Sequence, residues 1–283
     1  MELSVIIVNY NAASVLERCL MSLDHHLENL PHEICVVDNG STDGSRTLIK
    51  SRFPHVQLIA NDQNAGFTVA INQGLRKTSG RTVLWLNPDT EILDADIQAL
   101  LRYLKENPRV GILGPMLLNT DGQRQFSCRS FPSHKTALFN RYSLLTRWFP
   151  RNPFSQDYLH SDWNSTSIIQ KVDWVSGACL LHRREVSDVL GGLDERFFIY
   201  CEDVDFCLRA YQAGWETQYY PEMRVLHHVA EGGSRHKSVA RRMVVERHRS
   251  MWRYYAKHFK RNPLKDLATG TVLWLRCAAR LLL

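Results

Sequence analysis

Short apolar runs alternate with helix-period segments through the first 120 residues, and this alternation limits the fold more than any other feature of the chain. Leu3–Val8 is apolar without a break, as expected of a strand buried on both faces, whereas Val15–Leu23 repeats its apolar residues at helical spacing. Such repeats form right-handed βαβ units, so we expect an α/β fold with a mainly parallel central sheet flanked by helices. The other strands predicted here are Ile34–Val37, Val56–Ile59, Thr82–Leu86 and Val110–Leu113, and the other helices start near Gly44, span Ile71 and Leu75, and cover Asp94–Lys105.

The alternation is lost between Thr120 and Thr166, where we expect a long irregular excursion. Regular structure is predicted again from residue 172 onward. It comprises Val172–Leu181, a helix from Arg184, a helix over Glu202–Ala213 ended by Gly214, strands at Gln218–Tyr220 and Arg224–His227, and two basic helices broken near Asn262-Pro263.

Charge is distributed unevenly. The 283 residues carry a net charge of +6, but the segment from Arg235 to the end holds thirteen Lys and Arg against two acidic residues. We therefore expect a main domain over residues 1–234 and a basic, amphipathic helical extension over 235–283 that meets an anionic surface or substrate. The alternative is a solvated helical face.

Seven cysteines, an odd number without a CxxC pair, are typical of reduced core thiols in a cytosolic protein. Residues 1–8 lack the basic and apolar parts of a signal peptide, and no uncharged apolar run is long enough to cross a bilayer. These features favour a cytoplasmic location.

Carboxylates follow two predicted buried strands. Asp38 opens a Gly/Ser turn, where it could bind a ligand's ring N–H, and Asp89 in Asn87-Pro88-Asp89 could hold a hard divalent cation bridging two phosphates. Ligands of parallel α/β sheets bind at this carboxyl edge. Each motif alone could also be a simple turn or cap.

Three acids crowd the first turn of a predicted helix in Glu202-Asp203-Val204-Asp205. The helix dipole explains one or two of them, whereas such crowding is tolerated where a cation or substrate uses it. His227-His228 ends a predicted strand and could supply a metal ligand, and the glycines of Gly232-Gly233-Ser234 suit a loop that closes on a ligand.

Seven motifs taken in order resemble glycosyltransferase family 2, and within it the bacterial rhamnosyltransferase-like branch of cell-surface polysaccharide synthesis. They are SVIIVNYN, VVDNGSTDGS, NAGF, LNPDT, WVSGACLL, FFIYCEDVDFCLR and VLHH, and the resemblance covers about Leu3 to Ser234. It implies the GT-A fold of nucleotide-diphospho-sugar transferases and a catalytic domain over residues 1–234. It also implies transfer of a hexose with inversion.

The resemblance also implies a role for each matching residue. Asp203 would be the catalytic base, and Asp89 and His227 would bind Mg²⁺ or Mn²⁺, with His228 as the alternative ligand. Asn87 replaces the first carboxylate of the family's DxD motif, so modest metal affinity is expected. Nucleotide-sugar contacts would come from Tyr10, Asn11, Asp38, Asn64, Gly66, Asn87 and Asp89, sugar or acceptor contacts from Trp174, Gly177, Ala178 and Glu202, and help with the leaving diphosphate from Arg235 or Lys237.

Resemblance favours dTDP-rhamnose as donor, then UDP-sugars, with a glycan or polyprenyl-diphosphate-linked acceptor. The tail interleaves cations with aromatic residues between Arg241 and Arg261, which suits helices lying on the inner face of the cytoplasmic membrane. Leu264–Leu283 is too interrupted by charge to cross it. The alternative is that these helices cap the catalytic domain or make a homodimer contact.

Two other functional classes agree less well with the sequence. A nucleotidyltransferase normally has a Gly-rich phosphate loop with Lys or Arg after the first strand, which VNYNAAS lacks. A non-catalytic sugar- or nucleic-acid-binding protein could use the basic, aromatic tail. The joint presence of Asp38, Asp89, Asp203 and His227 argues against an inactive relative, and no nucleic-acid partner is expected.

Overall fold

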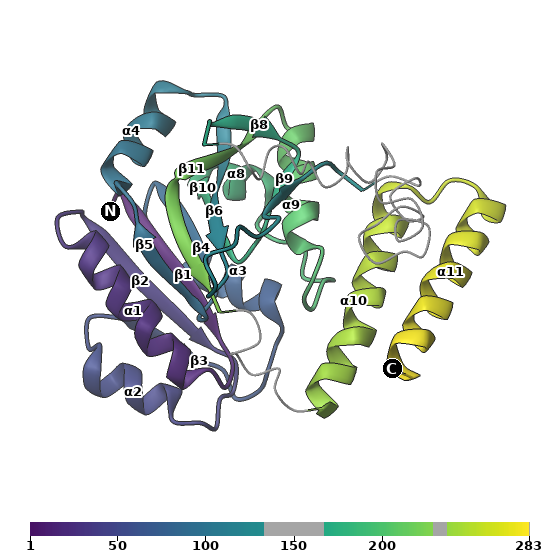
Figure 1. Cartoon of the computed structure of the whole chain (residues 1–283), viewed down its shortest axis with the longest axis horizontal. Coiled ribbons are helices and arrows are strands. Elements are labelled where there is room, and N and C mark those ends of the chain that lie inside the picture. Colours follow the sequence, from purple (N-terminus) through teal and green to yellow (C-terminus); the bar gives the residue numbers. More distant parts are fainter. Residues whose placement is uncertain (133–166, 229–236, 283) are drawn as a thin grey trace.

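The computed structural model describes residues 1–132, 167–228 and 237–282 (Figure 1). The predicted excursion lies outside these ranges from residue 133 to 166. So do the Gly232-Gly233-Ser234 loop, Arg235 and the boundary at residue 234. Lys237 begins a described helix, but its side chain is not described.

One nine-stranded sheet forms the centre of the molecule, in the order β3-β2-β1-β4-β10-β6-β11-β5, with β8 paired to β11. The first four strands are parallel to one another, and β6 and β11 are parallel as well. The prediction of a mainly parallel sheet is confirmed, with β10, β5 and β8 running antiparallel. The strands are β1 Leu3–Asn9, β2 His32–Asp38, β3 Gln57–Ala60, β4 Thr82–Leu86, β5 Thr90–Asp94, β6 Val110–Leu118, β8 Gln170–Val172, β10 Cys179–Arg183 and β11 Glu216–His227, and a small separate sheet pairs β7 Cys128–Arg129 with β9 Trp174–Val175.

Helices cover both faces of the sheet, because alternate residues of its buried strands point to opposite sides. Val5 and Ile7 pack in one core cluster with side chains of α1, α2 and α4, whereas Ile6 packs in a second cluster with α3, α8 and α9 (Figure 1). This three-layer arrangement is the predicted α/β fold. The helices are α1 Ala13–Leu27, α2 Ser45–Arg52, α3 Phe67–Lys77, α4 Ile97–Glu106, α8 Arg184–Leu190 and α9 Glu202–Gln212.

Three predictions of local structure were wrong in detail. The helix expected from Asp94 begins at Ile97, and the preceding residues form β5, which pairs with β11 about 130 residues later in the chain. The two strands expected around residues 218–227 are one strand, whose register shifts between Tyr220 and Arg224, where Pro221 interrupts the ladder. Val172–Leu181 is not continuous, because Gly177 and its neighbours separate β9 from β10.

The C-terminal segment forms two antiparallel helices, α10 Lys237–His258 and α11 Pro263–Leu282, as predicted (Figure 1). α10 packs on the body, and Tyr254 lies in the same core cluster as α9. Tyr254 and Tyr255 are buried, so the prediction that their rings meet a membrane was wrong. None of the described helices is long and apolar enough to cross a membrane.

None of the seven cysteines forms a disulfide, and six of them are buried. Only Cys201 is partly exposed. The prediction of reduced core thiols is confirmed for the other six.

Candidate active site

The carboxyl ends of β1, β2 and β4 meet at one edge of the sheet, where hydrogen bonds hold the residues that end or follow these strands. Asn9, the last residue of β1, donates from Nδ2 to Asp38 Oδ2 at 2.9 Å, at the end of β2. After β4, the Asn87 amide donates to Ala178 O at 2.9 Å. The register of the parallel strands therefore places Asp38 and Asn87 on either side of β1.

Asp38 is wholly buried and already has three donors. Besides Asn9, the Ser41 amide donates to Oδ1 at 3.1 Å and Arg46 Nε at 2.6 Å. Burial raises the pKa of Asp38, but these bonds outweigh it, so the pKa lies below its ordinary value and the carboxylate is charged. Asp38 is thus held inside the protein, and about a third of the Arg46 side chain is exposed beside it.

Tyr10 and Asn11 lie at the surface of the same edge. Tyr10 is exposed, as a residue that borders a ligand would be. Asn11 adopts the left-handed conformation at φ 50°, and its Oδ1 accepts a bond from the Thr42 amide at 2.8 Å. This bond ties the β1–α1 turn to the turn after β2.

The Asn64–Gly66 loop packs against the segment that precedes α9. Asn64 Oδ1 accepts from the Gly66 amide at 3.0 Å, and Gly66 has φ +94°. A side chain at Gly66 would meet Phe198, because an added Cβ would lie 2.7 Å from its ring. The Phe67 amide donates to Phe198 O at 2.7 Å. The loop at the predicted nucleotide side is therefore joined to the segment that leads into Asp203.

Asp89 and His227 face each other after β4 and at the end of β11. His227 Nε2 lies 3.4 Å from Asp89 Oδ1, and each side chain is 16% exposed. His227 Nδ1 lies 3.0 Å from Gln125 Oε1. The Gln125 amide nitrogen bonds Asn119 Oδ1 at 2.8 Å, so Oε1 is left as the acceptor and His227 Nδ1 must donate.

With Nδ1 donating to Gln125, Nε2 of His227 faces the Asp89 carboxylate and is the ring nitrogen that could bind a metal. Two electron-pair donors at this distance are favourable only with a proton or a cation between them, so this pair fits a divalent metal ion. The pair supplies only two ligands. In the described ranges 1–132, 167–228 and 237–282, no group of three His, Cys, Asp or Glu side chains could hold a metal.

His228 faces away from this pair. Its Nε2 lies 2.6 Å from Glu91 Oε1, and its backbone amide donates to Asp89 O at 2.8 Å. The geometry therefore favours His227 over His228 as the metal ligand, a choice that the sequence left open.

Asp203 lies at the start of α9, partly exposed. Its Oδ2 accepts from the Gly177 amide at 3.0 Å and its Oδ1 from the Val204 amide at 2.8 Å. Burial raises the pKa of Asp203, and these bonds and the charge of Arg129 oppose the rise without cancelling it. Since Ala178, next to Gly177, accepts the Asn87 bond, Asp203 and the Asn87–Asp89 turn are linked through two adjacent residues.

Glu202 is buried, and its Oε2 has no hydrogen-bond partner. Burial, together with the charge of Asp203, raises the pKa of Glu202 to about 8. The fold therefore favours the neutral form of Glu202, whereas two backbone amides stabilise the charged form of Asp203.

Trp174 is buried beside these acids. Its Nε1 donates to Ser130 O at 2.8 Å, and the Arg129 guanidinium lies 5.2 Å from the ring centroid. Gly177 lies next to Asp203, because an added Cβ would lie 3.4 Å from Asp203 Cβ, an ordinary van der Waals distance. Gly177 thus contacts Asp203, and sugar or acceptor contacts from Trp174, Gly177 and Ala178 stay a prediction, to which the buried Trp174 offers little surface.

Several residues of this site were missed from the sequence. Gln125 lies 102 residues from His227, and no local pattern connects them. Arg46 could have been suspected, since it follows the DNGSTDGS turn. Arg129, from the separate β7–β9 sheet, had no sequence signal.

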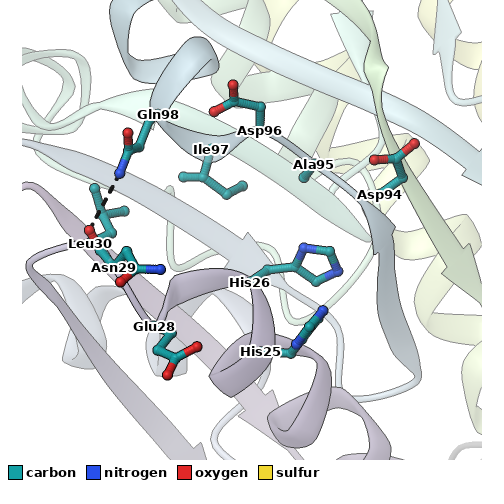
Figure 2. A pocket seen from close by; sticks show the side chains of 10 residues that line it. All are labelled: His25, His26, Glu28, Asn29, Leu30, Asp94, Ala95, Asp96, Ile97 and Gln98. Carbon is teal, nitrogen blue, oxygen red and sulfur yellow. Dashed lines mark hydrogen bonds between the residues drawn. The ribbon is translucent and has the colours of Figure 1, made fainter.

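A surface cavity of about 370 Å³ lies elsewhere (Figure 2). It is lined by the end of α1 and the start of α4, including His26, Asp94 and Gln98, and Gln98 Nε2 bonds Asn29 O across it at 3.4 Å. It contains none of the predicted site residues and lies at the amino edge of the β1–β2 strands. We assign it no role.

Comparison with known proteins shows which family and fold the chain shares. The family model for Glycosyl transferase family 2 matches residues 4–167. The chain is 34% identical over 271 residues to N-acetylglucosaminyl-diphospho-decaprenol L-rhamnosyltransferase of Mycobacterium tuberculosis, covering 89% of this chain and 86% of that protein. It is 24% identical to Rhamnosyltransferase WbbL of Escherichia coli, covering 89% and 92%.

The solved mannosyltransferase PcManGT from Pyrobaculum calidifontis, in complex with GDP-Man and Mn²⁺, has a similar structure. It superposes with a TM-score of 0.59 at 18% identity, covering 99% of this chain and 72% of that one. At this identity the likeness shows the fold alone. The fold is the predicted GT-A fold, with a C-terminal helical segment.

Proposed function

The chain belongs to glycosyltransferase family 2, and from this we propose that it moves rhamnose from dTDP-rhamnose to a hydroxyl of a glycan or lipid-linked glycan, with inversion. Its relatives in Mycobacterium tuberculosis and Escherichia coli are named rhamnosyltransferases, which supports rhamnose over another hexose. The alternatives are a UDP-sugar donor or a non-catalytic nucleotide-sugar-binding relative.

The observation that carries the proposal is the Asp203 carboxylate. It is partly exposed, its Oδ2 accepts from the Gly177 amide, and its pKa lies above the ordinary value because of burial. A raised pKa makes a carboxylate a stronger base at neutral pH. We assign Asp203 to accept the proton of the acceptor hydroxyl as it attacks the anomeric carbon from the face opposite the diphosphate.

Glu202 and the residues around Asp203 orient the acceptor. A protonated Glu202 can donate a hydrogen bond to a sugar oxygen without adding a second charge. Its Oε2 has no hydrogen-bond partner among the residues that the structure describes. Among the described residues the site offers no serine or cysteine nucleophile with a partner base, which agrees with a single inverting displacement.

Asp89 and His227 would hold Mg²⁺ or Mn²⁺, which supplies positive charge to the departing diphosphate. The fit rests on the lone pair of His227 that Gln125 directs toward Asp89. Asn87 is neutral and its carbonyl accepts from Thr90 Oγ1 at 2.6 Å, so it fixes the turn that presents Asp89.

The nucleotide would lie along Tyr10, Asn11, Asn64 and Gly66. Because Asp38 is buried and paired with Arg46, we assign it to hold Arg46 and the Ser41 turn in place. A direct bond from Asp38 to the base, implied by family resemblance, stays a prediction that requires Asp38 to become accessible.

A lipid-diphosphate-linked acceptor would place the enzyme at the inner face of the cytoplasmic membrane. The name of the mycobacterial relative includes such an acceptor, which supports this proposal. We keep the division into a catalytic domain over 1–234 and a helical extension over 235–283 as a proposal too. Tyr254 in the shared core means that α10 contributes to the catalytic domain's packing.

Turnover of a panel of nucleotide sugars tests the proposal. dTDP-rhamnose with an N-acetylglucosaminyl-diphospho-lipid acceptor should give product, and Asp203→Asn should lower kcat by about 10²–10⁴-fold with donor binding nearly unchanged. A higher rate with UDP-sugars would establish the alternative donor. Near-normal turnover in Asp203→Asn would assign the base elsewhere.

A further inference from the structure

The outward side of α11 is an exposed apolar surface. Leu264, Leu267, Leu275 and Leu282 are 79%, 70%, 66% and 88% exposed. Their spacing of three, eight and seven residues puts them on one helical face, and Trp274 and Val272 lie at its margins, 44% and 48% exposed. A twenty-residue helix is about 30 Å long, so this is a large uncovered surface.

The opposite side of α11 packs against α10. Tyr255 Oη donates to Asp266 Oδ1 at 2.7 Å, Trp252 packs over Gly270, and Cys277 is buried. The exposed leucines therefore lie on the side of α11 that faces away from α10.

The charged residues around this apolar surface indicate which partner could cover it, a second copy of the chain or a lipid surface. The two acids of the segment from residue 235, Glu246 and Asp266, are both turned inward, Glu246 to Arg249 at 2.7 Å and Asp266 to Tyr255. Exposed cations lie beside the apolar face instead, at Lys265 within α11 and at Lys260 and Arg261 just before it. A second copy of the chain docked symmetrically would bring these cations together, and like charges repel. An anionic lipid surface would attract them.

We propose that the Leu264–Leu282 face of α11 inserts into the interface of an anionic bilayer and anchors the enzyme beside its lipid-linked acceptor. The proposal deepens the proposed function, because the acceptor is the lipid-linked glycan proposed above. It also moves the membrane contact from the aromatic residues of α10, which the protein buries, to the leucines of α11. An interfacial helix of this type lies in the membrane plane with leucine and tryptophan in the acyl boundary and cations at the headgroups.

Flotation of the whole protein with vesicles tests the anchor, using phosphatidylcholine alone or mixed with phosphatidylglycerol. The protein should float only with the anionic mixture, and less in high salt, because salt screens exposed charges. Leu267→Ser with Leu275→Ser should lower lipid partitioning at least about tenfold. The matched control Met21→Ser with Val189→Ser removes two exposed apolar side chains from the body and should float like wild type.

Each other outcome overturns the proposal. These are wild type that stays unbound at low salt, a double serine variant that floats normally, or a dimer that the double variant converts to monomer without lipid binding. Thermal unfolding of the variant guards against misfolding, and Leu282→Ser, at the exposed helix end, gives a milder second test. Flotation needs neither donor nor acceptor, so it is independent of turnover. Absence of turnover with every donor would overturn the proposed function alone.

Discussion

The two adjacent acids that begin α9 differ in the donors that reach them. Two backbone amides donate to Asp203, from Gly177 and Val204, whereas the buried Glu202 leaves Oε2 without a partner. Amide bonds stabilise the charged form of a carboxylate, and burial without bonds stabilises the neutral form. The sequence alone presents three acids close together, and the folded contacts distinguish Asp203, the proposed base, from Glu202.

Glu202 should make folding stability fall as pH rises. Its pKa is about 8 in the fold against 4.5 for the free side chain, so the folded state holds an extra proton between these values. This contribution is fully favourable below the lower value and is lost as pH passes the higher one. Glu202→Gln should therefore unfold at a higher temperature than wild type near pH 9, with the difference shrinking toward about pH 5. The unfolding temperature of Glu2→Gln, a change at an exposed position, should follow that of wild type across this pH range. The same behaviour in Glu202→Gln would contradict the assignment.

Asp89 and His227 give a second test at the level of single residues. With Mn²⁺ present, Asp89→Ala or His227→Ala should weaken nucleoside diphosphate binding at least about tenfold, and chelator should remove the difference from wild type. His228→Ala is the matched control, because His228 bonds Glu91 and faces away. Calorimetric titration measures the affinities. Equal losses in both histidine variants would mean that the pair orders the strand end and does not bind the metal.

At the scale of elements, α10 holds the start of α9 in place. Tyr200 and Cys201 are in the left-handed region at φ 72° and 65°, which is strained for residues with a side chain. Ser250 Oγ of α10 donates to Ile199 O at 2.8 Å, and Arg247 lies 4.6 Å from the centroid of the Tyr200 ring. Such strain persists only where neighbours enforce it, so α10 supports the backbone that presents Asp203.

Asp205 joins the same two helices. It is wholly buried and contacts Arg209 at 2.8 Å, Lys257 at 2.7 Å and His258 at 2.7 Å. Burial raises the pKa of Asp205, but the bonds from His258 and Lys257 outweigh it and keep the pKa below its ordinary value. Asp205 is thus a structural ion-pair member, which removes it as an alternative base.

Removing Lys257 should disturb this connection. Lys257→Met leaves the buried Asp205 with fewer donors and should destabilise the protein by about 1–3 kcal/mol, or about 2–4 °C per kcal/mol. It should also lower kcat more than KM, because α9 carries Asp203, the proposed base. Lys260→Met, the same change at an exposed position, should leave both unchanged. A stable Lys257→Met enzyme with normal kcat would show that α10 does not position α9.

Across the whole molecule, local sequence patterns predicted most helices and strands, whereas contacts between distant segments determine how these elements pair and pack. The apolar runs of β1, β2 and β4 were recognisable because both faces are buried. No strand was predicted at Thr90–Asp94, because this segment becomes a strand only by pairing with β11. The site divides in the same way: the order of motifs located Asp89, Asp203 and His227, whereas Gln125 and Arg129 arrive from segments that no local spacing connects to them.

The same distinction applies to the C-terminal segment. Composition predicted two basic helices but could not tell which aromatic side chains are buried. In the structure, α10 supplies Tyr254 to the core cluster that contains Phe206 and Trp85, while α11 packs on α10 and leaves its leucines exposed. The two helices should therefore differ in what their removal does.

Two truncations should separate these roles. A chain ending at residue 262 loses only α11, and it should stay folded and bind donor nucleotide like the full chain, since the core cluster is intact. It should turn over soluble acceptors normally and lipid-linked acceptors poorly. A chain ending at residue 236 also loses Tyr254, Lys257 and His258, which opens the core and leaves Asp205 short of donors, so it should lose cooperative unfolding. Thermal unfolding and donor titration of both chains make the comparison. A well-folded, fully active chain ending at 236 would mean that the catalytic domain is complete without α10.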